Sequence, residues 1–271
     1  MKITGSIVTY NNDIGELKKA ISSFLNTALD IKLYISDNSE KDTIKEICKD
    51  KRIEYIFNNS NKGFGYAHNI AIKKAEKENS KYHFIINPDI YYKESQLEKM
   101  VDFLEKNEDV ALMMPKILYP NGEIQYVCKL LPTPFNLFSR GFLPNWNWVK
   151  KINDNYEMRF TNYDKVMEVP YISGCFMGFR TEIFKEIGYF DDNIFMYLEE
   201  TDISRRISIK GYKTVMYPEA QIYHKWEKGT HKSKKLRNIT IQSSIYYFNK
   251  YGWFFDSYRK KVNKKIKSQY K

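Results

Sequence analysis

Three carboxylates fall within four positions of the chain, in the run Tyr197-Leu-Glu-Glu-Thr-Asp202. A carboxylate placed beside a substrate hydroxyl can accept its proton as a general base. The same run opens a predicted helix over 200–210 that Gly211 ends, and acids in a first turn also complement the helix dipole. From these residues alone, the acids could act as a general base or could only complement the helix dipole.

Polar residues follow four predicted strands, at 9–12, 37–39, 58–63 and 87–89. The strands themselves are apolar and β-branched, at 3–10, 31–37, 53–57 and 82–86. In a doubly wound sheet the ligand lies beyond the carboxyl ends of the strands, so these residues should form one polar rim. Asp89 in Asn87-Pro-Asp89 could hold a divalent cation that bridges a diphosphate, although Asn-Pro-Asp is also an ordinary turn sequence.

Helical periods separate the strands, at 13–26, 41–50, 65–77 and 95–107, with Asp13 and Ser95 as expected N-caps. This alternation predicts an α/β fold with a doubly wound, mostly parallel sheet of the Rossmann-like kind. Residues 118–168 are rich in proline and aromatic residues and are expected to form a long loop or lid. Further elements follow, namely strands at 110–114, 169–179 and 213–217 and a helix at 181–187.

The composition restricts the class of protein. A chain of 271 residues with 42% hydrophobic content can bury a sizeable core. Three widely spaced cysteines argue against a disulfide framework and against a cysteine zinc site, so any metal should have oxygen ligands. The chain has no run of about 18 apolar residues and no signal-peptide pattern. We therefore expect a cytoplasmic protein.

Positive charge is concentrated at the carboxyl end. Residues 232–271 contain 12 lysines and arginines and one acid, Asp256, whereas the remainder contains 32 basic and 32 acidic residues. We expect a main domain over 1–228 and a basic, aromatic, helical tail over 229–271. The aromatic run Trp253-Phe-Phe favours contact with an anionic membrane surface over a merely solvated basic helix, and a nucleic-acid partner is not expected.

Seven motifs in order along the chain resemble family-two glycosyltransferases of the GT-A fold. The resemblance is greatest to the rhamnosyltransferase-like branch that builds bacterial surface polysaccharides. The motifs are Ile7-Val-Thr-Tyr-Asn11, Ser36-Asp-Asn-Ser39, Asn61-Lys-Gly-Phe-Gly-Tyr-Ala-His-Asn69, Asn87-Pro-Asp89, Ser173-Gly-Cys-Phe-Met-Gly178, Gly188-Tyr-Phe-Asp191 and Tyr197-Leu-Glu-Glu-Thr-Asp-Ile-Ser-Arg205. Gly63-Phe-Gly65 does not lie in the first strand-to-helix turn, so a Rossmann dehydrogenase is not expected.

This resemblance implies a role for each matching residue. The residues expected at the nucleotide are Thr9, Tyr10, Asn11, Asp37, Lys62, Asn69 and Asn87, with Asp37 at the imide edge of the base. Asp89 and His224 would hold Mg²⁺ or Mn²⁺. Glu200 would be the catalytic base, with Glu199 as the alternative. The residues expected near the acceptor or the donor sugar are Gly174, Cys175, Asp202, Arg205 and Trp226.

Several of these residues have a structural reading as well. Asp202 and Arg205 share a helix face and could form a surface ion pair. Residues 173–178 could be a bulged core strand in which Cys175 only packs. Two departures from the family pattern stand out: Asn87 replaces the first of two metal-site acids, and Glu200 stands where the family often has aspartate.

The resemblance also implies a reaction. We expect inverting transfer of a sugar from a dTDP- or UDP-linked donor to a hydroxyl of a lipid-linked glycan or of a bacterial surface glycan such as lipopolysaccharide, O-antigen or capsule. dTDP-rhamnose is the first expectation and a UDP-hexose the next. The enzyme would work at the inner face of the cell membrane. The alternative is a non-catalytic module that binds nucleotide-sugar or glycan.

Overall fold

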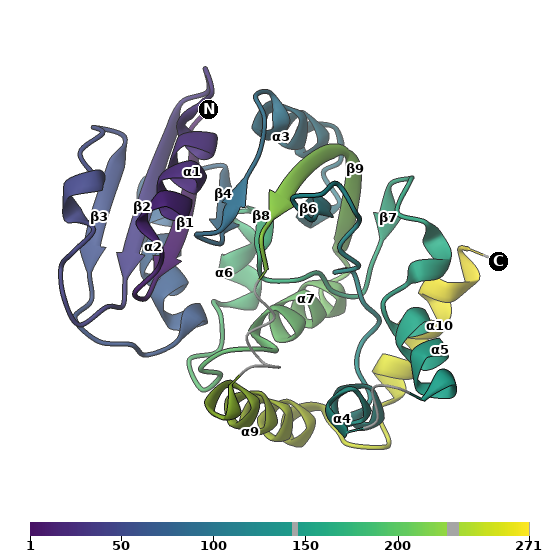
Figure 1. Cartoon of the computed structure of the whole chain (residues 1–271). Coiled ribbons are helices and arrows are strands. Elements are labelled where there is room, and N and C mark those ends of the chain that lie inside the picture. Colours follow the sequence, from purple (N-terminus) through teal and green to yellow (C-terminus); the bar gives the residue numbers. More distant parts are fainter. Residues whose placement is uncertain (143–145, 227–232, 271) are drawn as a thin grey trace.

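One mixed β-sheet organises the chain. The computed structural model describes residues 1–142, 146–226 and 233–270, which form a nine-stranded sheet in the order β3-β2-β1-β4-β8-β6-β9-β5, with β7 paired to β9 (Figure 1). The strands are β1 (Ile3–Thr9), β2 (Ile31–Asp37), β3 (Ile53–Phe57), β4 (Tyr82–Ile86), β5 (Ile90–Tyr91), β6 (Val110–Leu118), β7 (Met167–Glu168), β8 (Phe176–Arg180) and β9 (Lys213–His224).

The first half of the sheet is the predicted doubly wound unit. Strands β3, β2, β1 and β4 are all parallel, and every residue of β1 and β4 is buried. Helices α1 (Ile14–Leu25) and α2 (Phe64–Lys77) flank these strands (Figure 1). The Asp13 side chain accepts a hydrogen bond from the Glu16 amide, which confirms the expected N-cap.

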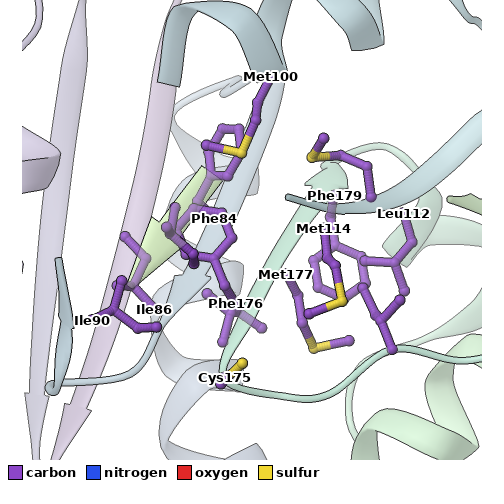
Figure 2. Packing of buried hydrophobic residues seen from close by; sticks show 14 of the residues in the cluster. Phe84, Ile86, Ile90, Met100, Leu112, Met114, Cys175, Phe176, Met177 and Phe179 are labelled. Carbon is purple, nitrogen blue, oxygen red and sulfur yellow. The ribbon is translucent and has the colours of Figure 1, made fainter. Parts of the chain in front are cut away.

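The second half adds antiparallel strands. Strand β8 lies between β4 and β6 and is antiparallel to both, whereas β6 and β9 are parallel. Close packing of β8 on β4 requires a glycine, because a Cβ on Gly178 would lie 2.7 Å from the Phe84 ring. Figure 2 shows the resulting core, where side chains of β4, β6 and β8 meet Met100 of helix α3 (Gln96–Lys106).

Three local predictions were wrong. Residues 41–50 contain only a short 3₁₀ helix, Lys45–Ile47, because the segment buries just Ile44 and Cys48 and short helices need an apolar face. Ser95 has a left-handed backbone, with φ of 66°, and its side chain does not cap α3. The strand expected at 169–179 is only β8, since the earlier residues make a single bridge between Tyr171 and Lys129.

Residues 118–168 are more ordered than the expected loop or lid. They contain α4 (Pro134–Phe142), α5 (Asn147–Tyr156), a 3₁₀ helix (Arg159–Thr161) and β7, while 143–145 lie outside the described residues. The Tyr156 hydroxyl lies 2.6 Å from that of Tyr171, which follows the segment, and within the segment Tyr163 donates to the carbonyl of the buried Cys128. The segment is therefore a packed helical layer.

The basic tail forms two helices, α9 (Lys234–Tyr251) and α10 (Ser257–Ser268). They lie beside α4, α5 and helix α7 (Glu199–Ile209) (Figure 1). Tyr247 and Phe248 of α9 are fully buried in one cluster with Leu198, and Ile266 joins the main core. The expected boundary at 228/229 lies outside the described residues. No helix of the described part is long and apolar enough to cross a membrane.

A buried ion pair joins the tail to the body. The two terminal nitrogens of the Arg205 guanidinium on α7, Nη1 and Nη2, contact the Asp256 carboxylate at 2.6 and 2.8 Å. Both side chains are almost fully buried. Asp256 also caps α10 by accepting from the Arg259 amide. The pair thus connects the start of α10 to the middle of α7.

We predict that Asp256→Asn lowers the free energy of unfolding by about 3–5 kcal/mol, because it leaves the Arg205 charge buried without its counterion. Urea denaturation measures the change. Lys213→Met, which removes an exposed pair with Asp109, should cost less than about 1 kcal/mol. Equal effects of the two substitutions would contradict the structural role of the buried pair.

Candidate active site

Asp37 lies at the carboxyl end of β2, directly beside Thr9 at the end of β1. Its carboxylate is fully buried and accepts three hydrogen bonds: from the Thr9 hydroxyl and the Ser39 amide at 3.0 Å, and from the Tyr55 hydroxyl at 2.8 Å. These donors fix the orientation of the carboxylate at the rim. The expected neighbours Thr9 and Asp37 therefore do come together.

Tyr10 and Asn11 form the exposed part of this rim. The Tyr10 hydroxyl donates to Glu40 at 2.8 Å, and the Asn11 side chain donates to the other Glu40 oxygen at 3.2 Å. Asn11 has a left-handed φ of 53°, and its amide donates to Ser39. Glu40 was missed, although it directly follows the Ser36-Asp-Asn-Ser39 motif. Lys62 is exposed in the loop after β3, with its ammonium 5.1 Å from the centre of the Tyr66 ring. Its neighbours Asn61 and Gly63 both accept hydrogen bonds from the Asn38 side chain at 3.4 Å, so this loop lies at the same rim.

Asn69 makes its hydrogen bonds within the protein. It is buried on α2, where its side-chain NH₂ donates to the Phe190 carbonyl and to Asp192, both at 2.9 Å. Its carbonyl oxygen accepts from the Phe190 amide at 3.0 Å. All of these partners belong to the segment that leads to α7. Asn69 therefore links α2 to this segment, and both protons of its side-chain amide are used in that link.

Asp89 and His224 meet at the end of the sheet. The short strand β5 pairs Ile90 with His224, and this register brings Asp89 Oδ2 to 3.3 Å from His224 Nε2. The other ring nitrogen of His224 contacts the Gln125 carbonyl oxygen at 3.0 Å. Gln125 was missed, since no pattern in the sequence connects it with His224. Asn87 contributes its backbone, donating to the Cys175 carbonyl at 2.9 Å.

The Asp89 and His224 pair could hold a divalent cation. Burial disfavours the imidazolium, but the contacts with Cys175 and Asp89 outweigh it and raise the pKa of His224 to about 10, so a cation bound here would have to displace the proton of the ring. The described residues contain no group of three or more His, Cys, Asp or Glu side chains arranged as a metal site. A carboxylate and an imidazole fit a cation whose remaining ligands are diphosphate oxygens and water, as is common for Mg²⁺.

Glu199 and Glu200 begin α7 after an unusual turn. Tyr197 and Leu198 both have left-handed backbones, with φ of 69° and 70°, which residues with side chains rarely adopt. One carboxylate oxygen of each glutamate is buried and has no hydrogen-bond partner within the described residues. Such strain and unsatisfied polar atoms are typical of functional sites.

Both glutamates are easier to protonate than ordinary carboxyls. Burial raises the pKa of Glu200, and burial together with the Glu200 charge raises that of Glu199 well above its usual range. Glu199 is only 5% exposed, whereas Glu200 is half-buried. Glu200 is therefore the more accessible of two carboxyls that are poised to exchange a proton.

The segment Gly174-Cys175 connects the glutamates with the Asp89 and His224 pair. A Cβ on Gly174 would lie 3.8 Å from the Glu200 Cβ, so the two residues are neighbours. The next residue, Cys175, is buried and contacts His224. Trp226 lies just beyond His224, and its exposed ring stacks 6.3 Å from that of Tyr119. Gly174, Cys175 and Trp226 thus lie next to Glu200 or His224.

Asp202 and Arg205 do not form the surface ion pair that their spacing allowed. Asp202 is fully buried and accepts hydrogen bonds from Arg206 and Lys250 at 2.8 Å and from the Tyr251 hydroxyl at 2.7 Å. Arg205 pairs with Asp256 instead. Both side chains face the tail helices, whose position the sequence pattern did not reveal. The Asp202 carboxylate and the Arg205 guanidinium thus form hydrogen bonds with the tail helices.

The sequence is similar to those of known proteins. The sequence model of "Glycosyl transferase family 2" matches residues 6–188. The chain is 20% identical to the N-acetylglucosaminyl-diphospho-decaprenol L-rhamnosyltransferase of Mycobacterium tuberculosis, over 83% of this chain and 76% of that protein. It is 24% identical to the rhamnosyltransferase WbbL of Escherichia coli, over 71% and 72% of the two chains.

Solved structures show the same fold. GalNAc-T7, crystallised with UDP, GalNAc and Mn²⁺, aligns with a TM-score of 0.63 at 15% identity, over 83% of this chain and 44% of that protein. TarS of S. aureus aligns with a TM-score of 0.60 at 13% identity, over all of this chain and 43% of that protein. The chain thus spans less than half the length of these two structures. With a match over more than half its length, this chain belongs to glycosyl transferase family 2 and is a GT-A-fold glycosyltransferase similar to rhamnosyltransferases.

Proposed function

We propose that the protein transfers a sugar with inversion from a nucleotide-sugar to a glycan hydroxyl, with Glu200 as the catalytic base. The observation that carries this proposal is the pair of carboxyls at the start of α7, each with one buried oxygen that has no hydrogen-bond partner among the described residues. A raised pKa suits a base that must take up a proton near neutral pH. Glu200 is preferred to Glu199 because its greater exposure lets an acceptor hydroxyl approach.

Inversion follows from a single displacement. The acceptor oxygen attacks the anomeric carbon from the side opposite the nucleoside diphosphate, while Glu200 removes the hydroxyl proton. The bond from the anomeric carbon to the diphosphate breaks, and the diphosphate leaves with the electron pair. Gly174 and Trp226 lie beside Glu200 and His224 respectively, so we assign them to the donor sugar and the acceptor.

Asp89 and His224 would hold Mg²⁺ or Mn²⁺ beside the donor diphosphate. The bound cation supplies positive charge that stabilises the leaving group. Gln125 orients the His224 ring through the nitrogen that faces away from Asp89. Asn87 provides no carboxylate here, so oxygens of the donor diphosphate would have to supply further ligands.

The donor and acceptor are proposed from chemistry and from relatives together. Asp37, in its ring of donors, stands at the rim where an acceptor can read the imide N–H that uracil and thymine share. Thr9, Tyr10, Asn11 and Lys62 would surround the nucleotide. Because the relatives named above transfer rhamnose, dTDP-rhamnose is the first donor proposed and a UDP-hexose the next. A lipid-linked or bacterial surface glycan is the proposed acceptor.

The tail would place this site at an anionic membrane on the cytoplasmic side. Asp256 is the tail's single acid and is neutralised inside the protein by Arg205, so the tail surface is uniformly basic. Phe254 is 77% exposed and Phe255 fully exposed at the connection between α9 and α10. Trp253, expected to join them, packs partly against Phe248. The two exposed phenylalanines are therefore the proposed membrane contact.

We predict that Glu200→Gln lowers kcat by about 10²- to 10⁴-fold and leaves nucleotide affinity unchanged, because the amide cannot accept the proton. The raised pKa places the acidic limb of the wild-type kcat profile above the ordinary value of 4.5, since activity falls as Glu200 is protonated. Steady-state kinetics measures kcat and its pH profile, and calorimetry measures nucleotide affinity.

A larger loss of kcat in Glu199→Gln than in Glu200→Gln would identify Glu199 as the base. Nucleotide binding without any turnover in the wild type would favour a non-catalytic module.

We predict that Mn²⁺ increases the thermal stabilisation by the true donor, because the cation and the diphosphate bind together at Asp89 and His224. A thermal-shift screen of dTDP-rhamnose, UDP-glucose and UDP-galactose, with and without Mn²⁺, identifies the donor. Asp89→Asn should remove the part of the shift that depends on Mn²⁺, and Asp109→Asn, at a surface pair, should preserve it. A metal effect that survives Asp89→Asn would rule out this site.

We predict that replacing Phe254 and Phe255 with serine weakens binding to vesicles containing phosphatidylglycerol by at least about tenfold, because each buried phenylalanine contributes roughly 1.5–3 kcal/mol. Vesicle sedimentation measures the change, and added salt should weaken the wild type further. Ile209→Ser, at an exposed position outside the tail, is the matched control. Unchanged sedimentation of the double variant would exclude these side chains as the membrane contact.

A further inference from the structure

The turn that presents Glu199 and Glu200 cannot hold its own conformation. Tyr197 and Leu198 are consecutive left-handed residues, and neither is glycine. Such a backbone persists only where the surrounding structure imposes it. The groups that impose it therefore decide where the two carboxylates point.

Helix α9 contacts this turn directly. The Ser243 hydroxyl donates to the Met196 carbonyl at 2.8 Å, one residue before the turn. The Leu198 side chain packs in one buried cluster with Tyr247 and Phe248. Both contacts come from the tail, beyond the region 6–188 that matches the family.

Lys250 of α9 joins the two sides of the turn. Its ammonium lies 2.8 Å from Asp191, which precedes the turn, and 2.8 Å from Asp202, which follows it in the first turn of α7. Tyr246 and Tyr251 support the same two carboxylates, at 2.9 and 2.7 Å. One cation thus fixes the distance between both ends of the segment 191–202.

The opposite side of this segment is fixed by the nucleotide half. The Phe195 carbonyl accepts from the Phe64 amide at 2.9 Å, and a Cβ on Gly63 would lie only 2.3 Å from that same oxygen. Asn69 holds Phe190 by two hydrogen bonds. Because α2 holds one side of the segment in place, the contacts from α9 determine which conformation the turn adopts.

We propose that Lys250 is a positioning residue for sugar transfer: by joining Asp191 to Asp202, it keeps the turn at 197–198 in the conformation that presents Glu199 and Glu200. The inference rests on the proposed role of these glutamates as base. Among the described residues, the hydrogen bonds and ion pairs of Lys250 are with Asp191 and Asp202 and not with either glutamate, so Lys250 acts through the backbone. Its removal should therefore affect the chemical step and spare nucleotide binding, which depends on the distant rim at Asp37.

The test compares Lys250→Met with Lys250→Arg and a matched control. Lys32 also bridges two carboxylates, Glu78 at 2.5 Å and Glu54 at 2.6 Å, and is 25% exposed against 32% for Lys250. Lys32 lies at the amino end of β2, at the opposite edge of the sheet from the site. Lys32→Met therefore removes the same kind of bridge without touching the turn.

Lys250→Met should lower kcat by roughly 10- to 100-fold, because small displacements of a reacting group cost this much. KM for the donor and nucleotide affinity should stay within about twofold. Lys250→Arg should restore most of kcat, since guanidinium can also pair with both carboxylates. Hydrogen–deuterium exchange of 196–202 should rise in Lys250→Met and remain unchanged in Lys32→Met.

The proposal would be overturned if folded Lys250→Met showed unchanged hydrogen–deuterium exchange of 196–202 or an unchanged kcat. It would also be overturned if nucleotide affinity fell as much as kcat. If Lys250→Met does not fold, Ser243→Ala combined with Tyr251→Phe removes single hydrogen bonds to the same segment, and the same comparison applies. Full activity in both Glu199→Gln and Glu200→Gln would overturn the proposed base. An inactive Glu200→Gln beside a fully active Lys250→Met would overturn the positioning role alone.

Discussion

Two neighbouring carboxyls at the start of α7 each keep one buried oxygen without a hydrogen-bond partner in the described part of the chain, and this unfavourable arrangement governs much of the structure around it. Left alone, Glu199 and Glu200 would turn toward water, and the left-handed turn before them would relax. The protein prevents this by fixing the chain on both sides. Asn69 and Phe64 of α2 hold the preceding segment, and Arg205 holds the helix that follows.

The mixed sheet explains how distant parts of the sequence reach this site. Parallel strands bring Thr9 and Asp37 to one edge. The short antiparallel strand β5 then turns Asp89 back onto the end of β9, where His224 stands. Because β8 lies between the two halves, the residues just before it, Gly174 and Cys175, reach Glu200 on one side and His224 on the other.

The sequence predicted what depends on local order and strand periodicity. The parallel half, the Asp13 cap and the neighbourhoods of Asp37 and Asp89 are of this kind, because the end of a strand places its following residue at the sheet edge whatever the rest of the chain does. The helix predicted over 41–50 was wrong for a related reason. The segment has helical spacing, but too few of its side chains are buried in the core to stabilise a helix.

Strand order and periodicity could not predict which residues far along the chain pair with Asn69, Asp202 and Arg205. The motif containing Asn69 pointed to a ligand, yet its amide is used by Phe190, which lies more than a hundred residues away. Asp202 and Arg205 have helical spacing for mutual contact, but Lys250 and Asp256 compete successfully for them. No pattern in α7 signals this, since the competing charges belong to a tail whose docking depends on burial of Tyr247, Phe248 and Ile266.

The docking of the tail also explains its surface charge. A buried ion pair contributes little net stability compared with apolar packing, but it fixes one orientation, because Asp256 must meet Arg205 or remain buried without a counterion. The same contact removes the tail's single negative charge from the surface. One residue therefore both seats the tail against α7 and leaves only basic residues among the exposed charged side chains of the tail that the structure describes. The orientation of that face relative to Glu199 and Glu200 is set by the pair itself, so a membrane bound there would meet the active site at a constant angle.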